Sequence, residues 1–249
     1  MSALRIERDG PVLQVTLARP ERRNAFDAAL IRELTEAFAD VGDVGLVVLS
    51  GEGDSFCAGA DVDWQRSAID LSLEENVEDA LRLYRMLDTI NRCPVAVVGR
   101  VQGYALGGGS GLVSCVDVAV AAADAVFGFT EVKLGIIPAV VSPFVFARIG
   151  RAHARRLFLT GERFDAATAL RIGLVHEVAA ELDASVDRVV GELLTSGPDA
   201  ARAAKQLVRE APATGGELAR LAAGMRASEE GQEGLRAFLE KRKPSWLGE

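Results

Sequence analysis

The sequence predicts an α/β protein in which strand–turn–helix units are followed by consecutive helices. Two stretches support the first part: at residues 45–63 and 95–117 an apolar β-branched run leads into a glycine-bearing turn. Beyond residue 151, periodic apolar segments are separated by glycine and proline, a pattern typical of successive helices. With 249 residues, 49% of them hydrophobic, the chain can bury a large core. We therefore expect a core over residues 1–190 and a helical region over 191–249.

The N-terminal part begins with a predicted β-hairpin at residues 4–18, where alternating residues are interrupted by an Asp-Gly-Pro turn. Asp27 is placed to cap the helix that follows. The apolar face of that helix contains Leu30, Ile31, Leu34, Phe38 and Val41. Residues 45–50 then form a short buried strand, and residues 51–63 form a loop.

The central part starts with a helix over residues 73–90, whose apolar residues recur at helical spacing and are expected in the core. A strand over residues 95–98 leads through a glycine turn at 103–109 into a helix over 112–116. Because the start of this helix lacks side-chain bulk, its N–H groups are bare at the positive end of the helix dipole. We expect this turn to hold an anionic or polarised oxygen.

The later elements follow from the same periodicities. Strands are predicted at 118–122, 125–129 and 174–178, and helical segments at 152–159, 166–172, 182–195, 198–210 and 215–240, with a further helix starting at Ser142-Pro143.

Composition excludes several function classes. The 28 basic and 36 acidic residues give a net charge of −8, which argues against general binding to nucleic acid or anionic membranes. The N-terminus has charges where a signal peptide is apolar, and no uncharged apolar run reaches the ~18 residues of a membrane span. We expect a cytoplasmic protein. The three cysteines, Cys57, Cys93 and Cys115, lie in apolar surroundings and are expected to be buried thiols.

The glycine run at 107–111 does not match the common glycine motifs. A dinucleotide fingerprint would need glycine at Leu112 or Ser114. A phosphate-binding P-loop has the right spacing between Gly103 and Gly108, but Gly109 stands where its lysine must be. A nucleophile elbow fails because Leu112 follows the serine-glycine pair. A phosphate cradle is therefore not expected here.

The two histidines offer little chemistry. A serine hydrolase would need Ser110 with His153 or His176, and neither histidine lies beside a strong loop motif. Two isolated histidines without a carboxylate cluster also give no metal-ligand spacing, so no metal site is expected.

A site built from backbone groups remains. Two glycine-bearing turns, at 58–61 and 107–109, each follow a predicted buried strand, so their N–H groups could converge on one carbonyl oxygen. Such an oxyanion hole needs an acid or base to move protons. Glu131 lies between two apolar stretches, where loss of hydration would raise its pKa toward neutrality. The alternative is a surface glutamate paired with Lys133.

Five motifs occur in order over nearly the whole chain. They are Arg19-Pro20 with Asn24-Ala25, then residues 56–61 (FCAGAD), 103–109 (GYALGGG), 131–138 (EVKLGIIP) and 238–244 (FLEKRKP). In this order and spacing they resemble the crotonase family, the enoyl-CoA hydratases and isomerases. The resemblance implies a spiral of ββα units followed by a helical C-terminal trimerisation region. It also implies a homotrimer or a hexamer built from two trimers.

The resemblance implies residue roles as well. The N–H groups of Ala60 and Gly108 would bind the thioester oxygen, and Glu131 would transfer protons. The acyl-CoA substrate would be held by Arg22, Ala25, Ala58, Ala60, Asp61, Val62 and Gly108, with Lys241 approaching the CoA of a neighbouring subunit. Coenzyme A would then be part of the substrate, and no separate cofactor is expected.

One position departs from the family pattern. Hydratases of this family typically carry two glutamates, and the first of them maps onto Gly111. One carboxylate is sufficient to move a double bond from the 3-enoyl to the 2-enoyl position. Water addition would require Glu131 both to orient the water and to supply the proton at C2. Relatives resembling methylglutaconyl- or carboxygeranoyl-CoA hydratases share both the glycine and the 134–144 pattern. We therefore expect an enoyl-CoA hydratase or isomerase, with a non-catalytic CoA-binding homologue as the alternative.

Overall fold

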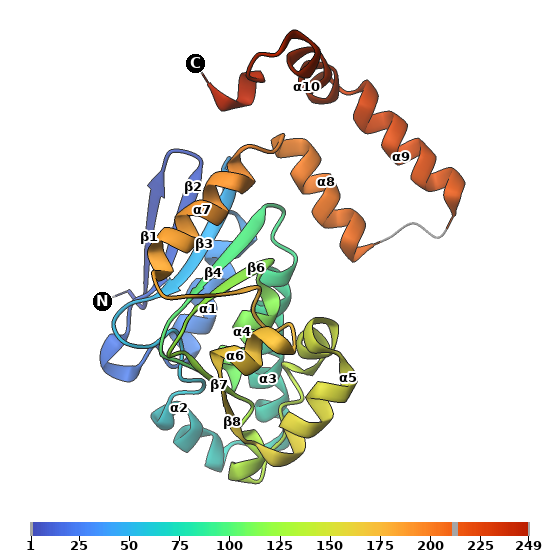
Figure 1. Cartoon of the computed structure of the whole chain (residues 1–249). Helices are drawn as coiled ribbons and strands as arrows, with labels where there is room; N and C mark the ends of the chain where they lie inside the picture. The colour runs from blue at the N-terminus through green and yellow to red at the C-terminus, as the bar shows by residue number, and fades with distance from the viewer. Residues whose placement is uncertain (1, 211–213, 249) are drawn as a thin grey trace.

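The computed structural model describes residues 2–210 and 214–248, and its main element is a six-stranded sheet (Figure 1). The strand order is β1-β2-β3-β4-β6-β9. The strands are β1 (Leu4–Asp9), β2 (Val12–Leu17), β3 (Leu46–Gly51), β4 (Ala96–Val101), β6 (Val118–Ala122) and β9 (Glu177–Ala179). The predicted hairpin is confirmed, because β1 and β2 pair antiparallel, and every other pair in this sheet is parallel.

A second sheet of three short strands was not anticipated in full. It has the order β5-β7-β8, with β5 (Tyr104–Leu106), β7 (Val126–Gly128) and β8 (Arg163–Asp165). The expectation that the turn after the central strand leads directly into a helix is wrong, since β5 lies between them. A three-residue strand between glycines has too few residues to show alternation. The glycine turn therefore joins β5, not β4, to α4 (Gly108–Cys115).

The central strands of the large sheet are buried on both faces, whereas the edge strand β1 is exposed along most of its length. Along β3, Val47 and Leu49 belong to the main hydrophobic cluster, and Leu46 and Val48 to a second cluster on the other face. The helix α7 (Leu182–Leu194) covers the second face, while α1 (Ala28–Ala39) and α3 (Leu73–Asn91) pack together on the main side (Figure 1). Because both faces are covered, these strands read as continuous apolar runs.

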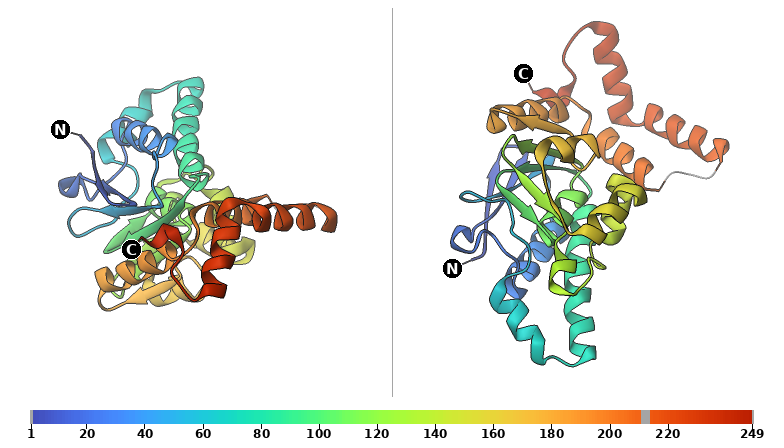
Figure 2. Two further views of the ribbon diagram at one scale, coloured as in Figure 1. Left: turned by 90° about the horizontal axis from the view of Figure 1, so that it is seen from above. Right: turned by 60° about the horizontal axis from the view of Figure 1, so that its bottom comes forward.

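The helix α3 corrects one expectation. Its C-terminal half is buried through Met86, Leu87 and Ile90, as expected of a core helix. The apolar residues of its earlier turns are exposed, so their assignment to the core is wrong; they are Leu73, Val77, Leu81 and Tyr84. Helical spacing shows that these residues share a stripe, but it carries no information on what covers the stripe. The two views of Figure 2 show this end of α3 extending beyond the sheet.

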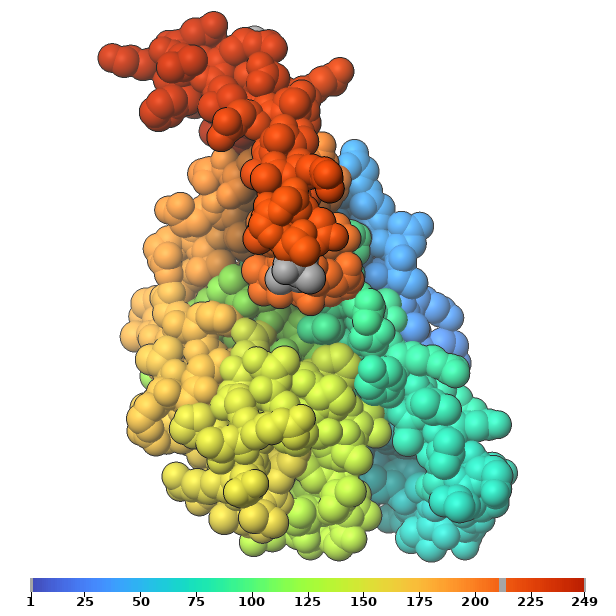
Figure 3. All heavy atoms as spheres, turned by 90° about the vertical axis from the view of Figure 1, so that its right-hand side faces the viewer, coloured from blue at the N-terminus to red at the C-terminus, as the bar shows by residue number. Residues whose placement is uncertain are grey.

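The helices α2 (Val62–Ser67), α5 (Ser142–Thr160) and α6 (Ala166–Arg171) complete the core. The last three helices form an arm: the first lies against the core, where Lys205 Nζ donates to Val95 O at 2.8 Å, and the other two project from it (Figures 1 and 3). They are α8 (Pro198–Arg209), α9 (Gly215–Ala227) and α10 (Glu229–Glu240). The predicted continuous segment at 215–240 is thus divided, because Ser228 is extended and its side chain caps α10 by accepting from the Gly231 N–H at 3.0 Å. The predicted boundary at residue 190 lies within α7 and stays a prediction.

Within the described residues, no helix has both the length and the apolar character needed to span a bilayer.

Candidate active site

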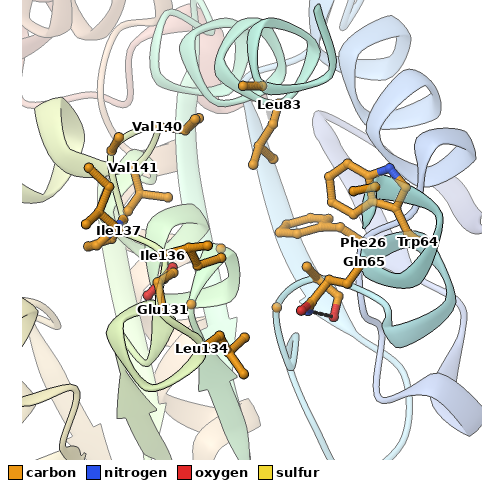
Figure 4. Close-up of a pocket in the computed structure, with 18 of the residues that line it drawn as sticks. Phe26, Trp64, Gln65, Leu83, Glu131, Leu134, Ile136, Ile137, Val140 and Val141 are labelled. Atoms are coloured by element: carbon orange, nitrogen blue, oxygen red, sulfur yellow. Dashed lines mark hydrogen bonds between the residues drawn. The ribbon is translucent and has the colours of Figure 1, made fainter. Parts of the chain in front are cut away.

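A cavity of about 320 Å³ lies between the loop after β3, the helix α3 and the segment after β7. Figure 4 shows Phe26, Trp64 and Gln65 on one side of it and Glu131 and Ile136 on the other. The described lining is largely apolar, and its polar side chains are Gln65, Asn76, Asp79, Thr130 and Glu131. We call this space the inner cavity. Ala60 and Gly108, the two predicted N–H donors, both line it.

The Ala60 N–H points away from its neighbouring chain segment. Phe26 forms a parallel bridge with Ala60, in which the Phe26 N–H donates to Gly59 O at 2.7 Å and Phe26 O accepts from the Asp61 N–H at 2.8 Å. These bonds use the peptide groups of Gly59 and Asp61, so both polar groups of Ala60 face the opposite way. The Ala60 carbonyl accepts from Gln65 Nε2 at 3.0 Å. Its N–H donates to no partner within residues 2–210 and 214–248.

The Gly108 N–H belongs to the first turn of α4, where N–H groups have no partner inside the helix. Gly107 precedes it with a positive φ of 51° and offers no side chain to cap the helix. Two close contacts explain why positions 108 and 109 are glycine. A Cβ on Gly109 would lie 2.1 Å from Cys57 O, and a Cβ on Gly108 would lie 2.8 Å from the Phe26 ring. The glycines therefore allow the 57–60 loop and the start of α4 to touch.

Glu131 begins a 3₁₀ turn, Glu131–Leu134, directly after β7. A Cβ built on Gly107 would lie 3.2 Å from Glu131 Oε1, so the carboxylate lies beside the start of α4. Its Oε2 is buried and has no hydrogen-bond partner among the described residues. Burial raises the pKa of Glu131 above its ordinary value, only partly offset by its own backbone N–H. Glu131 Oε2 is therefore not paired with Lys133, as the alternative would require.

A second, outer cavity of about 440 Å³ adjoins the first, and the two share Trp64. Arg22 and Asp61 line it, and Arg22 Nη2 lies 3.1 Å from Asp63 Oδ2. The mixture of paired charges here means that an anionic ligand would have to compete with Asp63 for Arg22. Ala58 lines the inner cavity. Ala25 is buried and Val62 is 65% exposed, and neither lines either cavity. Lys241 ends α10 on the projecting arm (Figure 1).

The Asp61 carboxylate is engaged by the fold itself. Its Oδ1 accepts from the Asp63 and Trp64 N–H groups at the start of α2, and Oδ2 lies 3.2 Å from Arg19 Nη2. Burial acts to raise the pKa of Asp61, but these N–H groups and the Arg19 charge outweigh it and lower the pKa. The carboxylate therefore holds the turn that follows Ala60. Binding of a ligand by Asp61 stays a prediction.

The position of the missing family glutamate is filled by a valine. Gly111 lies inside α4, and a Cβ on it would lie 2.5 Å from Val141 Cγ1. Val141 is itself buried and lines the inner cavity. A side chain at position 111 therefore cannot enter unless Val141 moves. Sequence reasoning identified the gap at Gly111 but gave no sign of what occupies the space.

Ser110 is not a nucleophile in this arrangement. Its Oγ donates to Ala105 O at 2.6 Å and accepts from the Gly128 N–H at 3.2 Å, so the hydroxyl joins β5, β7 and α4. His176 is engaged elsewhere: its Nδ1 accepts from the Ala119 N–H at 3.0 Å, and its Nε2 lies 3.2 Å from Arg148. The hydrolase alternative therefore has no geometric support. Across the described residues, no group of three or more histidine, cysteine or carboxylate side chains is placed to hold a metal ion.

The cysteines are buried free thiols, as expected. Burial raises the pKa of Cys57 to about 12, which leaves it protonated and unreactive at neutral pH.

Sequence reasoning placed the segment 63–76 and the apolar residues of 136–146 at the acyl pocket, and both segments contribute to the lining, but it missed Phe26, Asp79, Ala80 and Leu83. A signal existed for α3, because residues 76, 79, 80 and 83 recur at the spacing of one helical face. No signal existed for the contact between Val141 and Gly111, because it joins two elements that the sequence separates by 30 positions.

Comparisons with known proteins agree on one family. Residues 7–249 match the model of the enoyl-CoA hydratase/isomerase family. Crotonyl-CoA hydratase from Syntrophomonas wolfei is 32% identical over 254 residues, covering 97% of this chain and 96% of that protein. The solved structure of Pseudomonas aeruginosa AtuE is 40% identical with a TM-score of 0.94, and the match covers 98% of this chain and 99% of that chain. The solved structure of an enoyl-CoA hydratase from Shewanella pealeana is 38% identical with a TM-score of 0.92, and the match covers 98% of this chain and 96% of that chain.

Proposed function

The chain belongs to the enoyl-CoA hydratase/isomerase family, and we propose that it acts on an enoyl-CoA thioester through an enolate held by the Ala60 and Gly108 N–H groups. The observation that carries this proposal is the meeting of three features in the inner cavity. Two N–H groups without partners in the described residues line it, and so does the buried Glu131 carboxylate. Hydrogen at C2 of a thioester becomes acidic only when the developing enolate oxygen is stabilised.

Backbone N–H groups stabilise the negative charge that develops during the reaction. As a base takes the C2 proton, negative charge moves to the thioester oxygen, where two N–H dipoles are already in place. A single donor of this kind is typically worth ~10²–10³ in rate. Since the described lining is largely apolar, the hydrogen bonds act with little competition from water. No group beyond the protein and the CoA thioester is needed for this step.

Proton transfer falls to Glu131. Its raised pKa makes it a stronger base than an exposed carboxylate and keeps it able to return the proton near neutral pH. In isomerisation of a 3-enoyl thioester, Glu131 takes a proton from C2, the electrons spread to the oxygen and to C4, and Glu131 returns the proton at C4. In hydration, a water oxygen bonds to C3 and a proton reaches C2, which requires orienting the water as well.

The second candidate, isomerase in place of hydratase, is favoured by one specific observation. Val141 fills the space next to Gly111 where hydratases of the family carry their first glutamate. Relatives named hydratases favour water addition. We therefore propose hydratase activity first and isomerase activity as the alternative.

The experiment uses a panel of 2-enoyl-CoA and 3-enoyl-CoA thioesters with product masses measured. Hydration adds the mass of water, whereas isomerisation leaves the mass unchanged and shifts the double bond. Glu131→Gln keeps the side-chain shape and removes proton transfer, so turnover should be lost while CoA thioesters still bind. Binding without turnover by the unmodified protein would instead support a non-catalytic CoA-binding homologue.

We also propose that the protein assembles as a homotrimer or as a hexamer of two trimers. The projecting arm supports this proposal, since α8 and α9 have no buried residue in the described chain and α10 buries only Ala237.

A further inference from the structure

One wall of the inner cavity is formed by a single face of α3. Asn76, Asp79, Ala80 and Leu83 line it, and their spacing of three, four and seven residues places them on one side of the helix. Figure 4 shows Leu83 reaching from α3 toward the space between Val140 and Trp64. Ala80 and Leu83 are apolar, but Asn76 and Asp79 bring polar atoms to a largely apolar space. Among the described residues that line the cavity, Asp79 and Glu131 carry carboxylates.

Asp79 uses only one of its two oxygens. Its side chain is 15% exposed, and Oδ1 accepts from Arg82 Nη1 at 3.1 Å. Arg82 is 54% exposed and also lies 3.5 Å from Glu78 Oε2, so this ion pair faces outward. No donor in the described chain contacts Asp79 Oδ2. Asp79 Oδ2 is therefore open to a hydrogen-bond donor that enters the cavity.

Asn76 likewise presents an acceptor, at the exposed end of this wall. Its Nδ2 donates to Leu71 O at 3.1 Å and to Ser72 O at 2.9 Å. The opposite orientation of the amide would set Oδ1 against two carbonyl oxygens, so the assignment of the two atoms is fixed. Within residues 2–210 and 214–248, no group donates to Oδ1. Both polar side chains of this wall therefore offer acceptors and no donor.

We propose that the Asn76–Asp79 wall binds an O–H donor, either a hydroxyl on the acyl chain or the water that adds to the double bond. This inference rests on the proposed function, because it assigns a role within the same cavity. Two acceptors favour an O–H group and repel an acyl chain that ends in a carboxylate. The wall thus supplies on α3 a polar group that α4 lacks at Gly111. A hydrogen bond to a charged acceptor discriminates by about tenfold to a hundredfold.

The test compares Asp79→Asn with the matched control Glu78→Gln. Both variants replace a carboxylate that contacts Arg82 by an amide, but Glu78 is 69% exposed and does not line the cavity. In Asp79→Asn, Arg82 still requires an acceptor, so Oδ1 faces Arg82 and the amide N–H₂ replaces the free oxygen of the wall. The variant therefore exchanges an acceptor for a donor at constant size.

Two assays separate the two sources of the O–H group. In the first, 2-enoyl-CoA chains of equal length are compared with and without a hydroxyl at successive carbons from C4 outward. A substrate hydroxyl predicts that kcat/KM for the hydroxylated chain falls at least about tenfold relative to the plain chain in Asp79→Asn. In the second, hydration of a plain 2-enoyl-CoA is compared with isomerisation of a 3-enoyl-CoA. Bound water predicts about a tenfold loss of hydration only.

The inference is overturned if Asp79→Asn matches Glu78→Gln in both assays. If the unmodified protein turns over no enoyl-CoA, the proposed function fails. The role of the wall is then tested by measuring the affinity of the protein for CoA thioesters. Calorimetric titration with saturated acyl-CoA and hydroxyacyl-CoA of equal length should show about tenfold weaker binding of the hydroxylated chain by Asp79→Asn alone. Equal affinities of both variants for both ligands would contradict the inference on that route.

Discussion

The surroundings of Glu131 suit proton transfer but lower the stability of the folded protein. Its pKa is raised by burial, and its Oε2 has no partner among the described residues. Between the ordinary pKa of 4.5 and the raised value, the folded state binds more protons than the unfolded state. The free energy of unfolding therefore falls as pH rises through this window, and the loss is complete above the folded pKa.

The first prediction follows from this sign. Glu131→Gln removes the buried charge, so at pH 8 the variant should require more denaturant to unfold than the unmodified protein, and the difference should shrink toward pH 4. Urea unfolding across this pH range measures it. Glu36→Gln, on the exposed face of α1, is the control and should change the unfolding midpoint at pH 8 far less. Equal midpoints for Glu131→Gln and the unmodified protein at pH 8 would contradict the burial of this charge.

At the scale of elements, the contact between the 57–60 loop and α4 determines the site. A Cβ on Gly109 would meet the Cys57 carbonyl oxygen at 2.1 Å, an atom of the backbone that cannot rotate away. Gly109→Ala should therefore lower the free energy of unfolding by about 1–3 kcal/mol or more. Gly191→Ala is the matched control, since Gly191 lies inside α7 with nothing within 4 Å of its built Cβ. The same substitution there should stabilise by about 0.5–1 kcal/mol. A neutral Gly109→Ala would show that the loop does not pack on α4 as described.

The second contact at this scale joins α4 to the segment before α5. Gly111→Glu alone should be destabilising, because its Cβ meets Val141, and Val141→Ala alone should lose buried methyl groups. Combined, the two changes fit one space, so the double variant should be more stable than the sum of the single effects by about 1 kcal/mol or more. It should also raise hydration of 2-enoyl-CoA relative to Gly111→Glu. A double-mutant cycle with additive effects would contradict the contact.

The elements themselves were largely predictable from the sequence. The hairpin, the Asp27 cap, the buried strands and most helices follow from local periodicity and turn chemistry, and Leu30 N–H indeed donates to Asp27 Oδ1 at 2.8 Å. β5 and β8 were missed because three residues carry no measurable period. For the site, the glycine turns and Glu131 could be selected because their chemistry is local. The face of α3 at Asp79 and Leu83, and the contact between Val141 and Gly111, could not be selected, because they depend on contacts between distant elements.

At the scale of the whole molecule, two apolar surfaces have no cover within the described chain. One is the stripe of α3 that begins at Leu73, and the other is the arm, where Phe238 is 80% and Leu239 is 75% exposed. Helices that bury so little of their own apolar surface rarely hold a fixed position alone. In Figure 3 the C-terminal end of the arm rises above the core, while its first part lies in front of the core.

We therefore expect light scattering to give the mass of three or six copies of the 26.4 kDa chain. Replacing Phe238 and Leu239 together by aspartate should shift the population to smaller species. Ile6→Asp, on the outer strand β1, is the control and should leave the mass unchanged. A monomer at micromolar concentration in the unmodified protein would contradict the assembly.

The central claim is that Glu131 and the two backbone N–H groups create an enolate, and hydrogen exchange at C2 measures this step directly. A 3-enoyl-CoA incubated in heavy water with the protein should gain deuterium at C2 when the enolate is reprotonated there, and at C4 when isomerisation follows, observed by mass spectrometry and proton NMR. Glu131→Gln should bind the same thioester and show no exchange above the rate in buffer. Exchange by Glu131→Gln at the unmodified rate would contradict the account.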